Sequence, residues 1–133
     1  MAMIKVLTRG FAGIALFAAA AAPAIAAETR PFDRAAFAAA QEADRPILVE
    51  VKAWWCPVCG SQGRTIRETV ADPAYRDLIV FQINYDKQKG ELPQFQVTRQ
   101  GTILAYKGAQ QVGRLDFVTD KPRIRALIAQ TLR

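Results

Sequence analysis

The sequence predicts an α/β fold with a mixed central β-sheet and helices on both of its faces. Two patterns carry this prediction. Between residues 33 and 97, short apolar segments rich in β-branched residues alternate with segments of helical character. A hairpin over 102–116 and a last helix then close the chain. The resulting order, α-β-α-β-α-β-β-α, predicts parallel strands followed by an antiparallel hairpin, and therefore a mixed sheet.

The first two predicted elements are a helix over 33–43 and a strand over 47–53. Asp33 is a suitable N-cap for the helix, and Phe32 and Phe37 occupy hydrophobic-staple positions on either side of it. The strand is short, apolar and β-branched. Because strand side chains alternate between faces, two sets are expected on opposite sides: Leu48, Glu50, Lys52 and Trp54 on one, and Ile47, Val49, Val51 and Ala53 on the other.

The later elements follow from start and stop signals. Pro57 suits the first turn of a helix over 56–70, because that position needs no backbone N–H. The elements predicted after it are a short helix over 74–77, a strand over 78–83, a short helix over 91–97, strands over 102–107 and 111–116, and a helix that begins at Thr119 or Asp120. Four apolar residues of the last helix are spaced to share one face: Ile124, Leu127, Ile128 and Leu132.

Residues 1–27 have the pattern of a signal peptide, which leaves one domain over 28–133. A start with two basic residues precedes an apolar run over 10–22 and a small-residue segment, and cleavage is expected after Ala26 or Ala27. The run is shorter than the roughly 20 residues that span a bilayer, and an uncleaved anchor is the alternative. The sequence therefore predicts an exported, periplasmic protein that does not span the membrane after cleavage.

Composition excludes several functional classes. Residues 28–133 carry a net charge of +4, and the basic residues are scattered rather than clustered with aromatics, which argues against a nucleic-acid partner. The chain has two cysteines and no histidine. It therefore contains no Cys–His or Ser–His nucleophile pair and no Cys/His zinc site within one chain.

The two cysteines lie in the segment Cys56-Pro57-Val58-Cys59, at the predicted junction of a strand and a helix. The free N–H groups and the dipole of a helix N-terminus favour a thiolate at Cys56. Cys59 lies one turn away and can resolve a mixed disulfide at Cys56. A bridge this short constrains the unfolded chain little, so a redox pair is favoured over the alternatives, an inert bridge or half of a shared metal site.

Over about residues 32–132 the sequence resembles the thioredoxin family. The resemblance lies in the segment Trp55-Cys56-Pro57-Val58-Cys59, in the apolar strand before it, and in Phe-Gln-Ile-Asn-Tyr-Asp at 81–86. Ala-Asp-Pro-Ala-Tyr at 71–75 is similar to the C-terminal periplasmic domain of DsbD-type reductases. The resemblance implies a thioredoxin fold and a disulfide oxidoreductase that needs no cofactor beyond its own Cys56–Cys59 disulfide.

The resemblance also implies roles for residues near the cysteines. Glu50, six residues before Cys56, stands where the family has a buried carboxylate, and would accept the proton of Cys59. The alternative is a salt bridge between Glu50 and Lys52. A substrate-docking face is expected at Trp55, Pro57, Gln100 and Gly101, with Trp55 more exposed than Trp54.

Gly101 is the clearest departure from the family pattern, because the family has a cis-proline at this place. Without proline, a trans bond is expected before residue 101. Glycine also has the widest backbone freedom, so the loop over 100–102 is expected to be open and mobile and to tolerate a proline at 101.

Together these features predict a periplasmic protein-disulfide reductase. Its partners would be protein thiols or disulfides and a membrane electron-relay reductase. The alternative function is the handling of a soft metal, either copper or an iron–sulfur centre, by the same two thiolates.

Overall fold

The structure is a computed structural model that describes residues 20–21 and 26–133. Most of the predicted signal peptide lies outside the described residues. In the part of the chain that is described, no helix has both the length and the apolar character needed to cross a bilayer.

The core of the fold is one five-stranded sheet in the order β1-β3-β2-β4-β5. Its strands are β1 (Glu28–Pro31), β2 (Pro46–Lys52), β3 (Ile79–Asn84), β4 (Thr102–Lys107) and β5 (Gln110–Asp116). β1, β3 and β2 are parallel, whereas β4 is antiparallel to both β2 and β5. The predicted mixed sheet is thus confirmed.

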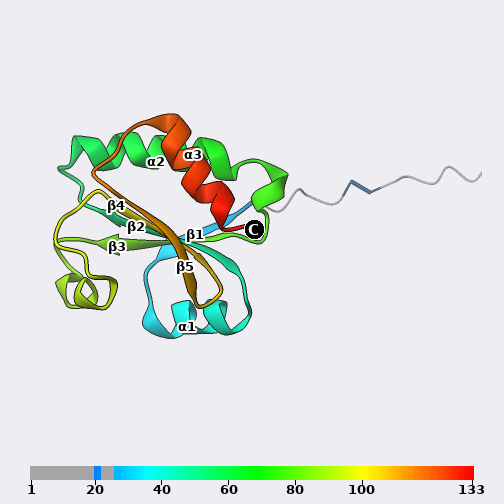
Figure 1. Cartoon of the computed structure of the whole chain (residues 1–133), viewed down its shortest axis with the longest axis horizontal. Coiled ribbons are helices and arrows are strands. Elements are labelled where there is room, and N and C mark those ends of the chain that lie inside the picture. Colours follow the sequence, from blue (N-terminus) through cyan, green and yellow to red (C-terminus); the bar gives the residue numbers. More distant parts are fainter. Residues whose placement is uncertain (1–19, 22–25) are drawn as a thin grey trace, which may run out of the picture.

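Helices cover both faces of the sheet. Helix α1 (Arg34–Glu42) lies on one face, and α2 (Pro57–Val70) and α3 (Lys121–Gln130) pack together on the other (Figure 1). The side chains on the two sides of β2 pack into two separate hydrophobic cores, as the alternation of its residues predicts. Ile47, Val49 and Val51 join the α1 side, and Leu48 joins the α2–α3 side.

The start of α1 follows its predicted chemistry. The Asp33 side chain accepts a hydrogen bond from Ala36 N–H at 2.8 Å. The rings of Phe32 and Phe37 pack with their centroids 5.6 Å apart. The cap satisfies a helix-terminal N–H, and the ring pair fixes how the chain enters the helix.

Two local predictions were wrong, and one strand was missed. β1 was not predicted because its sequence, Glu-Thr-Arg-Pro, has no apolar pattern, and its residues are exposed. The helix predicted over 91–97 is instead two single 3₁₀ turns, η2 (Lys89–Glu91) and η3 (Pro93–Phe95), and the second ends at Gln96 in the left-handed region. Leu132 is 43% exposed because α3 ends at Gln130, so its side chain leaves the apolar face.

Candidate active site at the Cys56–Cys59 disulfide

The cysteines are placed by the connection between β2 and α2. β2 ends at Lys52, a short turn follows, and Cys56 is the N-cap residue of α2 with Pro57 at the first helical position. Cys56 N–H donates to Ala53 C=O at 3.2 Å, which fixes the turn. The proline suits a helical position that has no backbone hydrogen-bond partner, so the sequence starts the helix directly after the first cysteine.

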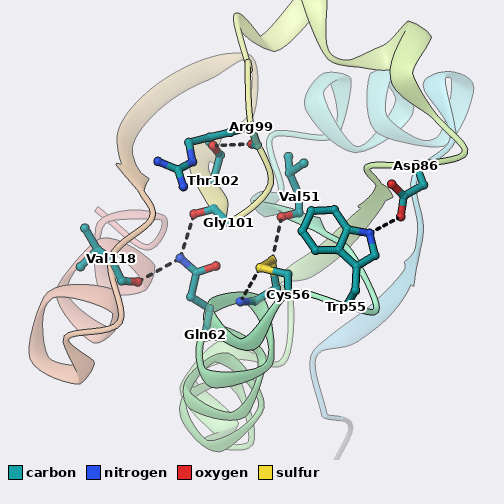
Figure 2. The surroundings of a disulfide bond; sticks show 10 residues. Val51, Trp55, Cys56, Gln62, Asp86, Arg99, Gly101, Thr102 and Val118 are labelled. Carbon is teal, nitrogen blue, oxygen red and sulfur yellow. Dashed lines mark hydrogen bonds between the residues drawn. A yellow bond between two sulfur atoms is a disulfide. The ribbon is translucent and has the colours of Figure 1, made fainter.

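Cys56 and Cys59 form a disulfide, with their Cα atoms 5.3 Å apart. The Cys56 sulfur accepts a hydrogen bond from Cys59 N–H at 3.1 Å, as a side-chain cap of α2 (Figure 2). Cys59 is 1% exposed and Cys56 is 5% exposed. In the reduced protein, the same N–H and the helix dipole would stabilise a negative charge on Cys56. Both cysteines are thus buried in the disulfide form, and the helix N-cap position is what distinguishes Cys56 as the nucleophilic sulfur.

Glu50 lies beneath this helix, in the middle of β2. Its side chain is buried, and one carboxylate oxygen accepts a hydrogen bond from Gln82 Nε2 at 2.9 Å. The other oxygen, Oε1, has no hydrogen-bond partner among the described residues. A β-carbon built on Gly63, one helical turn after Cys59, would lie 3.2 Å from that oxygen. The salt bridge to Lys52, the alternative for Glu50, does not form among the described residues.

The two tryptophans before the cysteines differ in exposure, and the order is the opposite of the prediction. Trp54 is 91% exposed and Trp55 is 46% exposed. The indole N–H of Trp55 donates to Asp86 at 2.9 Å (Figure 2). The Trp55 ring also packs edge-on against Tyr85. These contacts hold Trp55 against the body of the protein, whereas the side chain of Trp54 makes no such hydrogen bond or ring contact within the described part of the chain.

A cavity of about 280 Å³ opens beside Trp54. Lys52 and Gln82 also line it. Because Gln82 bonds to Glu50, this single amide lies between the buried carboxyl group and the cavity. This arrangement gives Glu50 a short polar link to the surface.

The loop at Gly101 is tightly held, and the expectation of an open loop was wrong. Gly101 is buried, and its N–H donates to Val51 C=O at 2.8 Å. Its own C=O accepts a hydrogen bond from Gln62 Nε2 at 2.8 Å (Figure 2). The same C=O also accepts one from Phe117 N–H at 2.8 Å. Its φ of +81° lies in the left-handed region, and no described peptide bond is cis. Gln100, also predicted at this face, is half-buried.

Gln62 is a residue that the sequence analysis missed. It is fully buried on α2, and its Nε2 donates to Gly101 C=O and, at 2.9 Å, to Val118 C=O. One amide thus ties the active-site helix to the Gly101 loop and to the segment after β5. The available signal was its spacing, because Cys59, Gln62 and Ile66 repeat at helical intervals along one buried face.

Phe117 and Arg99 were missed as well. Phe117 has a φ of +58°, which is uncommon for a residue with a side chain. Its ring covers Gly101 so closely that a β-carbon there would lie 2.9 Å from a ring carbon. The Arg99 guanidinium lies 3.6 Å from the centre of the same ring. No sequence pattern pairs these positions, because they come from different loops.

Within residues 20–21 and 26–133 there is no cluster of three or more Cys, His, Asp or Glu side chains placed to hold an ion. The two sulfurs of the structure are instead joined to each other as a disulfide.

The chain matches known proteins over most of its length. The Thioredoxin family model matches residues 28–130. A thioredoxin from Alicyclobacillus acidocaldarius subsp. acidocaldarius is 27% identical over 97 residues, which cover 73% of this chain and 91% of that protein. The crystal structure of Trxlp from Edwardsiella tarda EIB202 is 40% identical with a TM-score of 0.73, covering 76% of this chain and 98% of that one.

A more distant structure agrees in fold. The thioredoxin Mala s 13 of Malassezia sympodialis has 16% identity and a TM-score of 0.69, covering 82% of this chain and 96% of that chain. The region matched by the family model contains all five strands and the cysteine pair, and the resemblance to the thioredoxin family is confirmed. The chain therefore belongs to the thioredoxin family and is a thiol–disulfide oxidoreductase.

Proposed function

We propose that this oxidoreductase works as a reductase of protein disulfides in an exported compartment. One observation carries the proposal: the Cys56 sulfur caps the start of α2 and accepts the Cys59 N–H at 3.1 Å. That position favours a thiolate, which is the nucleophile a reductase needs. A membrane electron-relay reductase, or another dithiol donor, would restore the reduced form.

The reaction runs in two exchange steps. The Cys56 thiolate attacks one sulfur of a protein disulfide, that bond breaks, and the released substrate thiolate takes up a proton. Cys59 then loses its proton to Glu50, attacks Cys56 and releases the second substrate thiol. Two electrons pass to the substrate, and the Cys56–Cys59 disulfide is left behind for the dithiol donor to reduce.

The redox potential tests the direction of electron flow. Equilibration of the cysteine pair against a glutathione series is expected to give a potential closer to the reducing end of the family range, about −270 mV, than to the oxidising end, about −120 mV. A value near the oxidising end would contradict the reductase proposal. The metal content of freshly purified, reduced protein checks the soft-metal alternative.

Glu50→Gln is expected to slow resolution of the mixed disulfide by about tenfold or more, with little effect on its formation. The reason is that only the resolving step takes a proton from Cys59. Rapid-quench kinetics of the two steps is the measurement. Glu68→Gln is the matched control, because Glu68 lies exposed on the same helix in weak surface ion pairs. Equal resolution rates in the wild type and Glu50→Gln would remove Glu50 from the mechanism.

We further propose that residues 1–27 direct export and are then removed. The support is the basic start, the apolar run and the small residues that follow. The intact mass of the protein from a periplasmic extract is expected to correspond to a chain that begins at Ala27 or Glu28. A full-length mass, or recovery from the membrane fraction alone, would overturn this proposal.

A further inference from the structure

The guanidinium group of Arg99 lies near the active site. Arg99 lies over the Phe117 ring at 3.6 Å from its centre. The ring in turn covers Gly101, and the position of a β-carbon on Gly101 is 3.5 Å from Val58, one of the two residues between the cysteines. These contacts form a continuous path from the Cys-Pro-Val-Cys segment to the guanidinium. Figure 2 shows the Arg99 side chain on the same loop as Gly101 and Thr102.

No carboxylate of the described residues pairs with Arg99, and its side chain donates no hydrogen bond among them. Arg99 acts on the carboxylate of Asp116 through its charge, but that carboxylate already has other hydrogen-bond partners. Arg114 binds that carboxylate with both Nε and Nη2, at 2.9 Å for the shortest contacts, and Thr102 Oγ1 donates to it at 2.9 Å. Arg114 holds the pKa of Asp116 below its usual range, with a smaller effect from Arg99. The charge of Asp116 is therefore already balanced by Arg114, and Asp116 forms no ion pair with Arg99.

The stacked geometry prepares Arg99 for one kind of ligand. A guanidinium lying on an aromatic ring keeps its N–H groups in a plane parallel to that ring, with their donors pointing outward. The fork of these donors fits a carboxylate, which can accept two parallel hydrogen bonds. Stacking also restricts the side chain before binding, so less conformational freedom is lost when the carboxylate arrives.

We propose that Arg99 binds a carboxylate of the protein substrate next to the disulfide that is being reduced. This inference rests on the proposed function and deepens it: the preferred substrates are disulfides whose cysteine is flanked by aspartate or glutamate. The mild positive charge of residues 28–133 favours the same partners.

Three peptides test the inference. Each contains one disulfide, and they differ only in whether glutamate, glutamine or lysine flanks the cysteine. With a dithiol to regenerate the enzyme, kcat/KM at low ionic strength is expected to be about fivefold higher for the glutamate peptide than for the glutamine peptide, which equals ~1 kcal/mol. The lysine peptide is expected to be the slowest, and the glutamate advantage should shrink as salt is added.

Substitutions assign the effect to Arg99. Arg99→Gln is expected to bring the kcat/KM of the glutamate peptide down to that of the glutamine peptide. Arg99→Lys keeps the charge without the fork and should retain part of the advantage. Lys107→Gln is the matched control, since Lys107 is an exposed cation at the other end of β4, and it should leave the advantage unchanged.

Two results would overturn the inference while leaving the proposed function intact: equal kcat/KM for all three peptides in the wild type, or a glutamate advantage that survives in Arg99→Gln. Failure to reduce any of the three peptides would contradict the proposed function itself, and the inference with it.

Discussion

Cys56→Ala is expected to abolish turnover of protein disulfides, whereas Cys59→Ala is expected to stop the reaction at a mixed disulfide. The difference follows from geometry. Both cysteines are buried, but Cys56 caps α2 and receives the Cys59 N–H, while Cys59 lies one turn inside the helix. Only Cys56 is placed to attack a large substrate, and only Cys59 is placed to release it.

Mass spectrometry under non-reducing conditions measures this asymmetry. Cys59→Ala should accumulate a covalent adduct with the substrate, and the adduct should disappear when a dithiol is added. Cys56→Ala should form none, and the double variant serves as the background. In the reduced wild type, Cys56 should alkylate at lower pH than Cys59. Alkylation of both with the same midpoint, near the pH of about 8.5 of an ordinary cysteine, would refute the division of roles.

Gly101→Pro is expected to destabilise the fold by about 3 kcal/mol, contrary to the tolerance that the sequence suggested. A proline ring fixes φ near about −65°, whereas Gly101 has a φ of +81°. Proline also removes the N–H that donates to Val51 at 2.8 Å, and it places carbon atoms where the Phe117 ring lies. All three effects lower the free energy of unfolding.

Urea unfolding measures this change in the free energy of unfolding. Gly101→Ala should have an intermediate cost, about 1–2 kcal/mol, because it keeps the N–H but places a β-carbon in left-handed backbone. Gly90→Ala is the control, since a β-carbon there meets nothing within 4 Å and the φ of Gly90 is not positive. A Gly101→Pro variant as stable as the wild type would show that this loop rearranges freely.

The sequence predicted the features that depend on local chemistry. The alternation of β2, the Asp33 cap and the Cys56 helix start each depend on residues a few positions apart, and the structure shows all three. β1 is an instructive contrast. Its four exposed residues, three of them polar, form a strand only because β3 lies alongside them, so nothing in their own sequence indicates it.

The parts of the site that the sequence analysis missed are contacts between distant segments. Gln62 reaches Gly101 and Val118 across 39 and 56 positions of the chain. The role of this amide cannot be predicted from the sequence, because the Gly101 loop and the segment after β5 come close to it only in the folded chain. The sequence likewise showed that Gly101 was unusual, but the consequence depended on what covers it, and Phe117 comes from another loop.

Gly101 and Phe117 also constrain the order in which this site can change during evolution. A β-carbon at position 101 meets the ring of residue 117, so a larger residue at 101 is obstructed as long as the phenylalanine remains. Phe117→Gly removes the ring and relieves the left-handed backbone of a residue with a side chain. A lineage that first loses the ring removes this clash, and only the left-handed backbone of residue 101 then opposes a larger side chain. The reverse order adds the clash to the backbone strain. The two positions are therefore expected to vary together among related chains, with larger residues at 101 found only where residue 117 lacks the ring.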